Sequence, residues 1–175
     1  MLGTILRKLG LDVDVDDERG TGALDAIADA LEHMDPAEAR YIAAVAYLLS
    51  RVAQADHDVT EAERASVERA LVDHSGLAPD RAAIVTTLAT SQMIHVRGTQ
   101  DYLVTREFAT MATREQKRAL LDALFAVSAS DASIVTVEDN EIRRIASEIG
   151  LEHGDVVETR QRYRDRLAVL KREDV

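Results

Sequence analysis

The chain has 175 residues, of which 46% are hydrophobic and 30% are charged, and its formal net charge is −11. This composition excludes a disordered chain, and the length suits one domain with a substantial core. The negative charge argues against a nucleic-acid partner, because the surface would repel a phosphate backbone.

In chain order, the apolar periodicity predicts helices and no convincing strand. We expect a short amphipathic helix over 2–9 and an acidic loop over 11–20, so that the segment 1–20 packs weakly. The helices expected after it begin at about residues 22, 36, 61, 79, 100, 114, 136 and 155, and the last runs to about 172. The fold class is therefore all-α, with roughly seven or eight helices in one domain over 21–175.

Helix boundaries are marked by residues that satisfy free backbone groups. Three helices open with a pattern typical of a capping box. These pairs are Asp35 with Glu38, Thr60 with Glu63, and Thr113 with Gln116. Gly76 and Gly150 follow predicted helices and are expected to end them.

The sequence also bears on location. No apolar run approaches the roughly 20 residues of a membrane span, and residues 1–10 lack the features of a signal peptide. The chain has no cysteine, which excludes disulfides and thiolate metal sites and is typical of a reducing compartment. We therefore expect a cytoplasmic protein.

The chain contains an internal repeat, found by shifting it along itself by 75 residues. The copies cover about 40–77 and 115–151. Matching positions include Ala44 and Ala119, Leu49 and Leu124, Val52 and Val127, Asp56 and Asp131, Val59 and Ile134, and Glu63 and Glu138. The pattern predicts two pseudo-symmetric antiparallel helical hairpins, with the apolar members of these pairs buried and the acidic members at each tip.

The acidic tips admit a structural interpretation. The Asp ends one helix and faces the start of the next, where its carboxylate would accept backbone N–H groups. The Glu lies in the first turn of the second helix, as a capping box requires.

The tips also admit two functional interpretations. The first tip offers Asp56, Asp58, Glu61 and Glu63 as oxygen ligands for Ca²⁺, Mg²⁺, Mn²⁺ or Zn²⁺, and His57 adds a nitrogen for the last two ions. The second tip offers Asp131 and Glu138, with Ser133 and Asp139 nearby, and is expected to bind less well. Alternatively, the acidic rim recognises a protein partner.

These tips carry a resemblance to a known family. Residues 55–63, ADHDVTEAE, resemble the A-D-G-x-I-S-x-x-E signature of TerB-like proteins, the tellurite-resistance group. Residues 130–138, SDASIVTVE, resemble its second occurrence, and the resemblance extends over about 22–172. The chain departs from the signature at His57 and Ala132, which replace glycine, and at Ser133, which stands where the first copy has Asp58.

The resemblance implies an all-helical fold of two hairpins, a role in stress and tellurite resistance, cation binding through the acidic motifs, and protein association. It implies no catalytic activity. A related domain occurs in some membrane-anchored J-domain co-chaperones, so an interaction module without a ligand is the alternative, and self-association remains open.

Other chemistry finds little support in the sequence. The first tip lacks the glycine and the terminal glutamate of an EF-hand, and the chain has none of the common nucleotide-binding or hydrolase motifs. A hydrolase built on paired carboxylates would lack a recognisable nucleophile and base. The arginines of the last helix suit a solvated helix against an acidic body rather than an RNA site.

Overall fold

The computed structural model describes residues 22–53, 60–91, 101–129 and 134–167, together with residue 4 and the pairs 14–15 and 94–95. Its fold is all-α, as the sequence predicts. The α-helices of the described part are α2 (Gly22–Glu32), α3 (Pro36–Ala53), α4 (Glu61–Ala70), α5 (Pro79–Thr90), α6 (Asp101–Met111), α7 (Arg114–Ala129), α8 (Thr136–Glu148) and α9 (His153–Arg162). A π-helical turn, η2 (Leu71–Ser75), continues α4, and a 3₁₀ turn, η3 (Arg164–Arg166), follows α9.

The predicted capping residues begin their helices. Asp35 Oδ1 accepts from the N–H groups of Ala37 (2.9 Å) and Glu38 (3.2 Å), and Pro36 opens α3. Glu38 does not close the box, because its carboxylate accepts from Arg81 of α5 at 2.7 Å. The helix ends are also as predicted, since Gly76 and Gly150 adopt the left-handed conformation, with φ of 69° and 81°.

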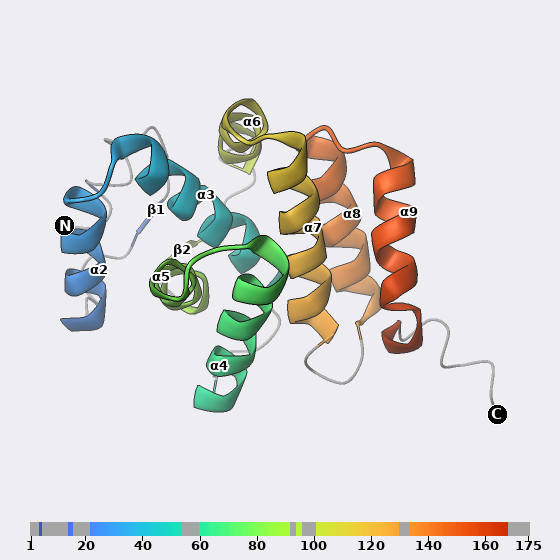
Figure 1. Cartoon of the computed structure of the whole chain (residues 1–175), viewed down its shortest axis with the longest axis horizontal. Coiled ribbons are helices and arrows are strands. Elements are labelled where there is room, and N and C mark those ends of the chain that lie inside the picture. The colour runs from blue at the N-terminus through green and yellow to red at the C-terminus, as the bar shows by residue number, and fades with distance from the viewer. Residues whose placement is uncertain are drawn as a thin grey trace.

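Helix α3 lies at the centre of the molecule and packs against α5, α6, α7 and α8 (Figure 1). It is buried almost all round, and its many alanines let neighbouring helices approach closely. Helices α7, α8 and α9 stand side by side along one end of the molecule, whereas α2 lies at the opposite end (Figure 1). Among the described residues, no helix combines the length and apolar character that crossing a membrane requires.

The two copies of the repeat both contribute buried side chains, but they do not form matching hairpins. Leu49, Val52, Leu124 and Val127 are all buried, as the sequence predicts. However, α7 and α8 pack against each other, whereas α4 packs mainly against α5 and α7. The structure therefore does not confirm two matching hairpins.

Two other expectations need correction. The last helix ends at Arg162 rather than near 172, because η3 redirects the chain after it. Leu167 is then buried beside Ile134, and the Ile134 N–H donates to the Arg166 carbonyl at 2.7 Å. A two-residue strand, β1 (Asp14–Val15), pairs antiparallel with β2 (Ile94–His95), where the sequence indicated none. Apart from residues 4, 14 and 15, the segment 1–20 lies outside the described residues, so its weak packing stays a prediction.

Candidate functional site

At the first tip, the described carboxylates begin α4. Thr60 and Glu63 form a reciprocal capping box, in which the Thr60 N–H donates to Glu63 Oε2 (2.5 Å) and the Glu63 N–H donates to Thr60 Oγ1 (3.3 Å). The bond from the Thr60 backbone, with a smaller contribution from its hydroxyl, lowers the pKa of Glu63. Glu61 is exposed in the same turn, whereas Asp56, His57 and Asp58 lie outside the described residues.

At the second tip, the carboxylates are also engaged. Glu138 accepts from the Val135 N–H at 2.9 Å, but Val135 has no side-chain oxygen to return a bond. Asp139 is only 5% exposed and accepts two bonds from Arg160, at 2.9 and 3.1 Å. Asp131 and Ser133 lie outside the described residues.

The tip residues do not form a metal centre within the described part of the chain. No three His, Asp or Glu side chains there are grouped so as to hold a metal ion. Glu63 and Glu138 instead stabilise helix starts, as the structural interpretation predicts.

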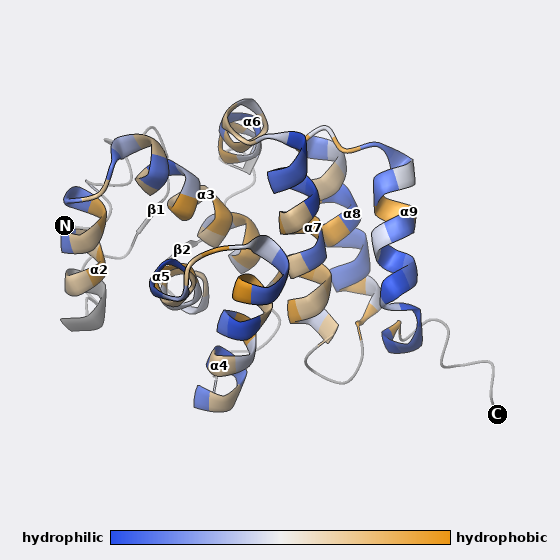
Figure 2. Cartoon of the chain, in the orientation of Figure 1, coloured by the Kyte–Doolittle hydropathy of each residue, from blue (hydrophilic) through white to orange (hydrophobic). Residues whose placement is uncertain are grey.

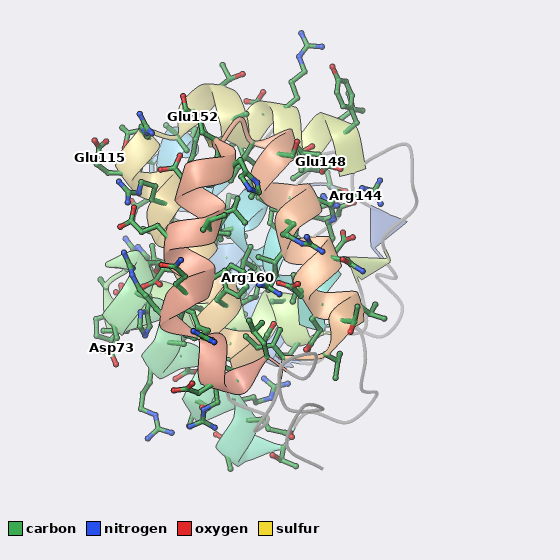
Figure 3. All side chains as sticks on the ribbon, turned by 90° about the vertical axis from the view of Figure 1, so that its right-hand side faces the viewer. Asp73, Glu115, Arg144, Glu148, Glu152 and Arg160 are labelled. Carbon is green, nitrogen blue, oxygen red and sulfur yellow. The ribbon has the colours of Figure 1, made fainter. Side chains whose placement is uncertain are left out.

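The sequence reasoning missed a belt of ion pairs that joins the helices. Arg51 of α3, whose side chain is buried, donates to Glu141 (2.6 Å) and Glu148 (2.8 Å) of α8. Burial alone would lower the pKa of Arg51, but the hydrogen bonds to Glu148 and Glu141 outweigh it and raise that pKa. Arg144 pairs with Glu148 at 2.9 Å on the outer side of α8 (Figure 3).

The same belt ties α9 to its neighbours. Arg160 lies between α9 and α8, where it meets Asp139 (Figure 3). Asp155, at the start of α9, is 6% exposed and lies 3.3 Å from Arg114 and 3.5 Å from Arg118 of α7. Because these acids are buried and paired, they hold helices together and are not free to bind a ligand.

A second cluster that the sequence did not reveal surrounds η2. His74 Nδ1 lies 2.7 Å from Asp122 Oδ2, and the Tyr163 hydroxyl lies 3.2 Å from both Asp122 Oδ1 and the Asp122 carbonyl oxygen. Burial and the neighbouring Asp122 raise the pKa of Tyr163, so the hydroxyl stays protonated and can donate. The cluster links the end of α4, α7 and the end of α9. No local signal in the sequence points to these contacts, because Asp122 lies 48 residues from His74 and 41 residues from Tyr163 in the chain.

Two exposed valines lie near the second tip. Val135 is 43% exposed and Val137 is 78% exposed, although valine favours burial. They flank the start of α8, where the backbone is already capped by Glu138. Neither residue was singled out as a binding residue from the sequence.

In the described part of the chain, these features define an all-helical domain in which Glu63 and Glu138 cap helices and the buried charges are paired. The comparison with known families then gives its class. The family described as "Tellurite resistance protein TerB" matches residues 42–161, more than half of the chain, and the chain belongs to that family. Neither the curated proteins nor the solved structures gave a significant match.

Proposed function

We propose that this TerB-family chain is a non-enzymatic interaction module that contributes to tellurite or stress resistance by binding a protein partner. The family match supports the link to tellurite resistance. The absence of cysteine supports a cytoplasmic location, and it removes one route by which the chain could itself reduce tellurite.

The exposure of Val135 and Val137 is the observation that carries this proposal. Full burial of a valine is worth about 1.5–3 kcal/mol, so a partner that covers these side chains would gain part of that free energy. Among the described residues of this tip, Glu138 accepts from the Val135 N–H and Asp139 pairs with Arg160, so the described part of the tip offers the two valine side chains rather than open carboxylates.

A photo-crosslinking experiment tests the partner. The photoreactive residue p-benzoylphenylalanine is placed at position 137 and, as a control, at Leu103, an exposed apolar residue of α6. Irradiation of cells is expected to give one discrete adduct from position 137 and none from position 103. The absence of an adduct from position 137 would contradict the proposal.

A genetic experiment tests the link to resistance. Val137→Asp adds a charge to the exposed surface, and an acidic residue in the first turn of α8 suits the helix dipole, so the fold should be retained. Cells that carry this variant should lose tellurite resistance relative to wild type. If the variant cells keep wild-type resistance, the second tip has no role in tellurite resistance.

The second candidate function is a divalent cation bound at the first tip, favoured by the exposure of Glu61 outside the capping box. Asp56 and Asp58 would supply further oxygen ligands. The Glu63 carboxylate would have to give up its hydrogen bond from the Thr60 N–H before it could coordinate the ion. A bound ion would raise the melting temperature, and the rise would be larger for an ion that binds more tightly.

The cation is tested by melting chelator-treated protein with millimolar Ca²⁺, Mg²⁺, Mn²⁺ or Zn²⁺. An Asp58→Asn, Glu61→Gln variant should lose the ion-induced shift, whereas Asp131→Asn, the control at the second tip, should retain it. If none of the ions moves the wild-type melting curve, the cation function is rejected and the interaction module stands alone.

A further inference from the structure

The start of α8 and the turn after α9 are in backbone contact, and both carry exposed side chains. The Ile134 N–H donates to the Arg166 carbonyl at 2.7 Å, and Ile134 pairs with Leu167 in a parallel bridge, so these distant segments lie side by side. In Figures 1 and 2, the hydrophobic segment that enters α8 adjoins the hydrophilic end of α9. Val135, Val137, Arg164 and Arg166 are all exposed here, and we call them the valine–arginine surface.

The two arginines of this surface differ from those that precede them. Arg160 pairs with Asp139, and Arg162 pairs with Asp122 and Glu158. Neither Arg164 nor Arg166 has a carboxylate partner among the residues that the structure describes. Asp165 lies between them in sequence, but the side chains of consecutive residues in a 3₁₀ turn point about 120° apart. Within the described part of the chain, both guanidinium groups are therefore available to an anion.

Several backbone groups at this surface already have hydrogen-bond partners. The Val135 N–H donates to Glu138, and the Val135 carbonyl accepts from the Asp139 N–H at 3.0 Å. The Leu167 N–H donates to the Arg164 carbonyl at 3.2 Å. A partner cannot add a strand at these groups, so recognition would depend on the valine and arginine side chains.

The charge of the whole chain narrows the class of partner. At a net charge of −11, the body would repel an extended polyanion such as nucleic acid or an anionic membrane. A short polypeptide segment can place a few carboxylates on a local basic spot without covering the acidic body. Aliphatic side chains in the same segment would cover the exposed valines.

We propose that the valine–arginine surface binds an acidic segment of a partner polypeptide, in which aliphatic side chains lie among the carboxylates. Guanidinium–carboxylate contacts would set the orientation, and burial of the valines would add affinity. This inference rests on the proposed interaction function and names the chemistry of its partner.

The test is a selection of random short peptides, displayed on phage, against the full chain. The selected peptides should be enriched in Asp and Glu together with Val, Ile or Leu. The most enriched peptide is then labelled with fluorescein and titrated by fluorescence anisotropy. Arg164→Ala with Arg166→Ala should weaken its binding about tenfold, with a smaller effect at high salt, and Val137→Ser should weaken it by a similar factor.

Matched controls lie on α6, where Arg106 and Leu103 are exposed but far from this surface in the chain. Arg106→Ala and Leu103→Ser should leave the affinity unchanged, whereas Asp165→Asn should strengthen binding by removing a nearby negative charge. Circular dichroism checks that each variant is folded.

Several outcomes overturn the inference. Selected peptides without acidic residues would do so, as would binding that is unaffected by the arginine and Val137 variants. Binding of the same surface to phosphatidylglycerol vesicles, to RNA or to a second copy of the chain, in place of acidic peptides, would also reject it. An adduct from position 137 that is insensitive to Arg164→Ala and Arg166→Ala rejects this inference alone, whereas the absence of any adduct rejects the interaction function itself.

Discussion

The starts of α4 and α8 occupy matching positions in the sequence repeat but are stabilised in different ways. At α4, Thr60 and Glu63 satisfy each other's backbone groups in an exposed turn. At α8, Val135 stands where α4 has Thr60, so Glu138 caps from one side only. Asp139, the next residue, instead reaches Arg160 of α9. One helix start is therefore stabilised locally, and the other by contacts with distant parts of the chain.

This difference bears on what each tip can do. A ligand at the first tip would act mainly on the first turn of α4, because the recorded hydrogen bonds of Thr60 and Glu63 lie within the capping box. A partner at the second tip would lie beside Asp139, Arg160 and the buried Leu167. Binding there could therefore be transmitted to α9. Four predictions test how far this difference extends.

The largest effects are expected in the core that the two copies share. Leu49→Ala and Leu124→Ala each remove a buried side chain and leave a cavity, which should lower the free energy of unfolding by about 2–5 kcal/mol. Chemical denaturation measures both. A loss below about 1 kcal/mol at either position would show that the two copies do not contribute equally to the core.

The next effect concerns the buried acid at α8. Arg160→Ala leaves Asp139 buried with its main partner removed, and should cost about 3 kcal/mol. Arg162→Ala, the matched control two residues away, breaks only pairs of a half-exposed arginine and should cost less than about 1 kcal/mol. Equal small losses would mean that Arg143, 3.7 Å from Asp139, is a sufficient partner.

Smaller changes in stability are expected from substitutions at the N-cap residues of α4 and α8. Thr60→Ala removes the side-chain acceptor at the start of α4 and should cost about 1 kcal/mol. Val135→Thr supplies the missing acceptor at α8 and should stabilise the chain by about 0.5–1 kcal/mol. If Val135→Thr destabilises the chain instead, the valine at this position has a packing role that the exposed fraction does not reveal.

Much of the fold could be predicted from the sequence because its signals are local. Helix starts depend on residues three apart, such as Thr60 and Glu63, and helix ends on a glycine such as Gly76. Burial of Leu49 and Leu124 follows from helical periodicity, which also needs no tertiary information. The predicted end of the last helix, near residue 172, was wrong. The observed end depends on Leu167 being buried beside Ile134, and no local pattern encodes that contact.

The candidate site was predicted less completely, for a related reason. The sequence placed Glu63 and Glu138 at helix starts and gave their capping roles as one interpretation, which the structure supports. It did not reveal that Asp139 meets Arg160 or that His74 meets Asp122, because each pair is brought together only by packing between helices. It also grouped Arg164 and Arg166 with the paired arginines of a continuous helix.

The smallest expected effect is a pH dependence at the first tip. Bonds from Thr60 hold the pKa of Glu63 below its ordinary value of 4.5. The unfolded chain therefore binds this proton more readily than the folded chain, so the stabilisation by Glu63 is present above 4.5 and is lost as the pH falls through the folded value. Glu63→Gln removes the titrating group, and the stability difference between wild type and this variant should shrink as the pH is lowered from neutral to well below 4.5. In a Thr60→Ala background, stability should keep most of this pH dependence, because the bond from the Thr60 backbone lowers the pKa of Glu63 more than the Thr60 hydroxyl does. A difference between wild type and Glu63→Gln that stays constant across this range would show that the box is not formed in solution, and the first tip would then be open for its carboxylates to coordinate an ion.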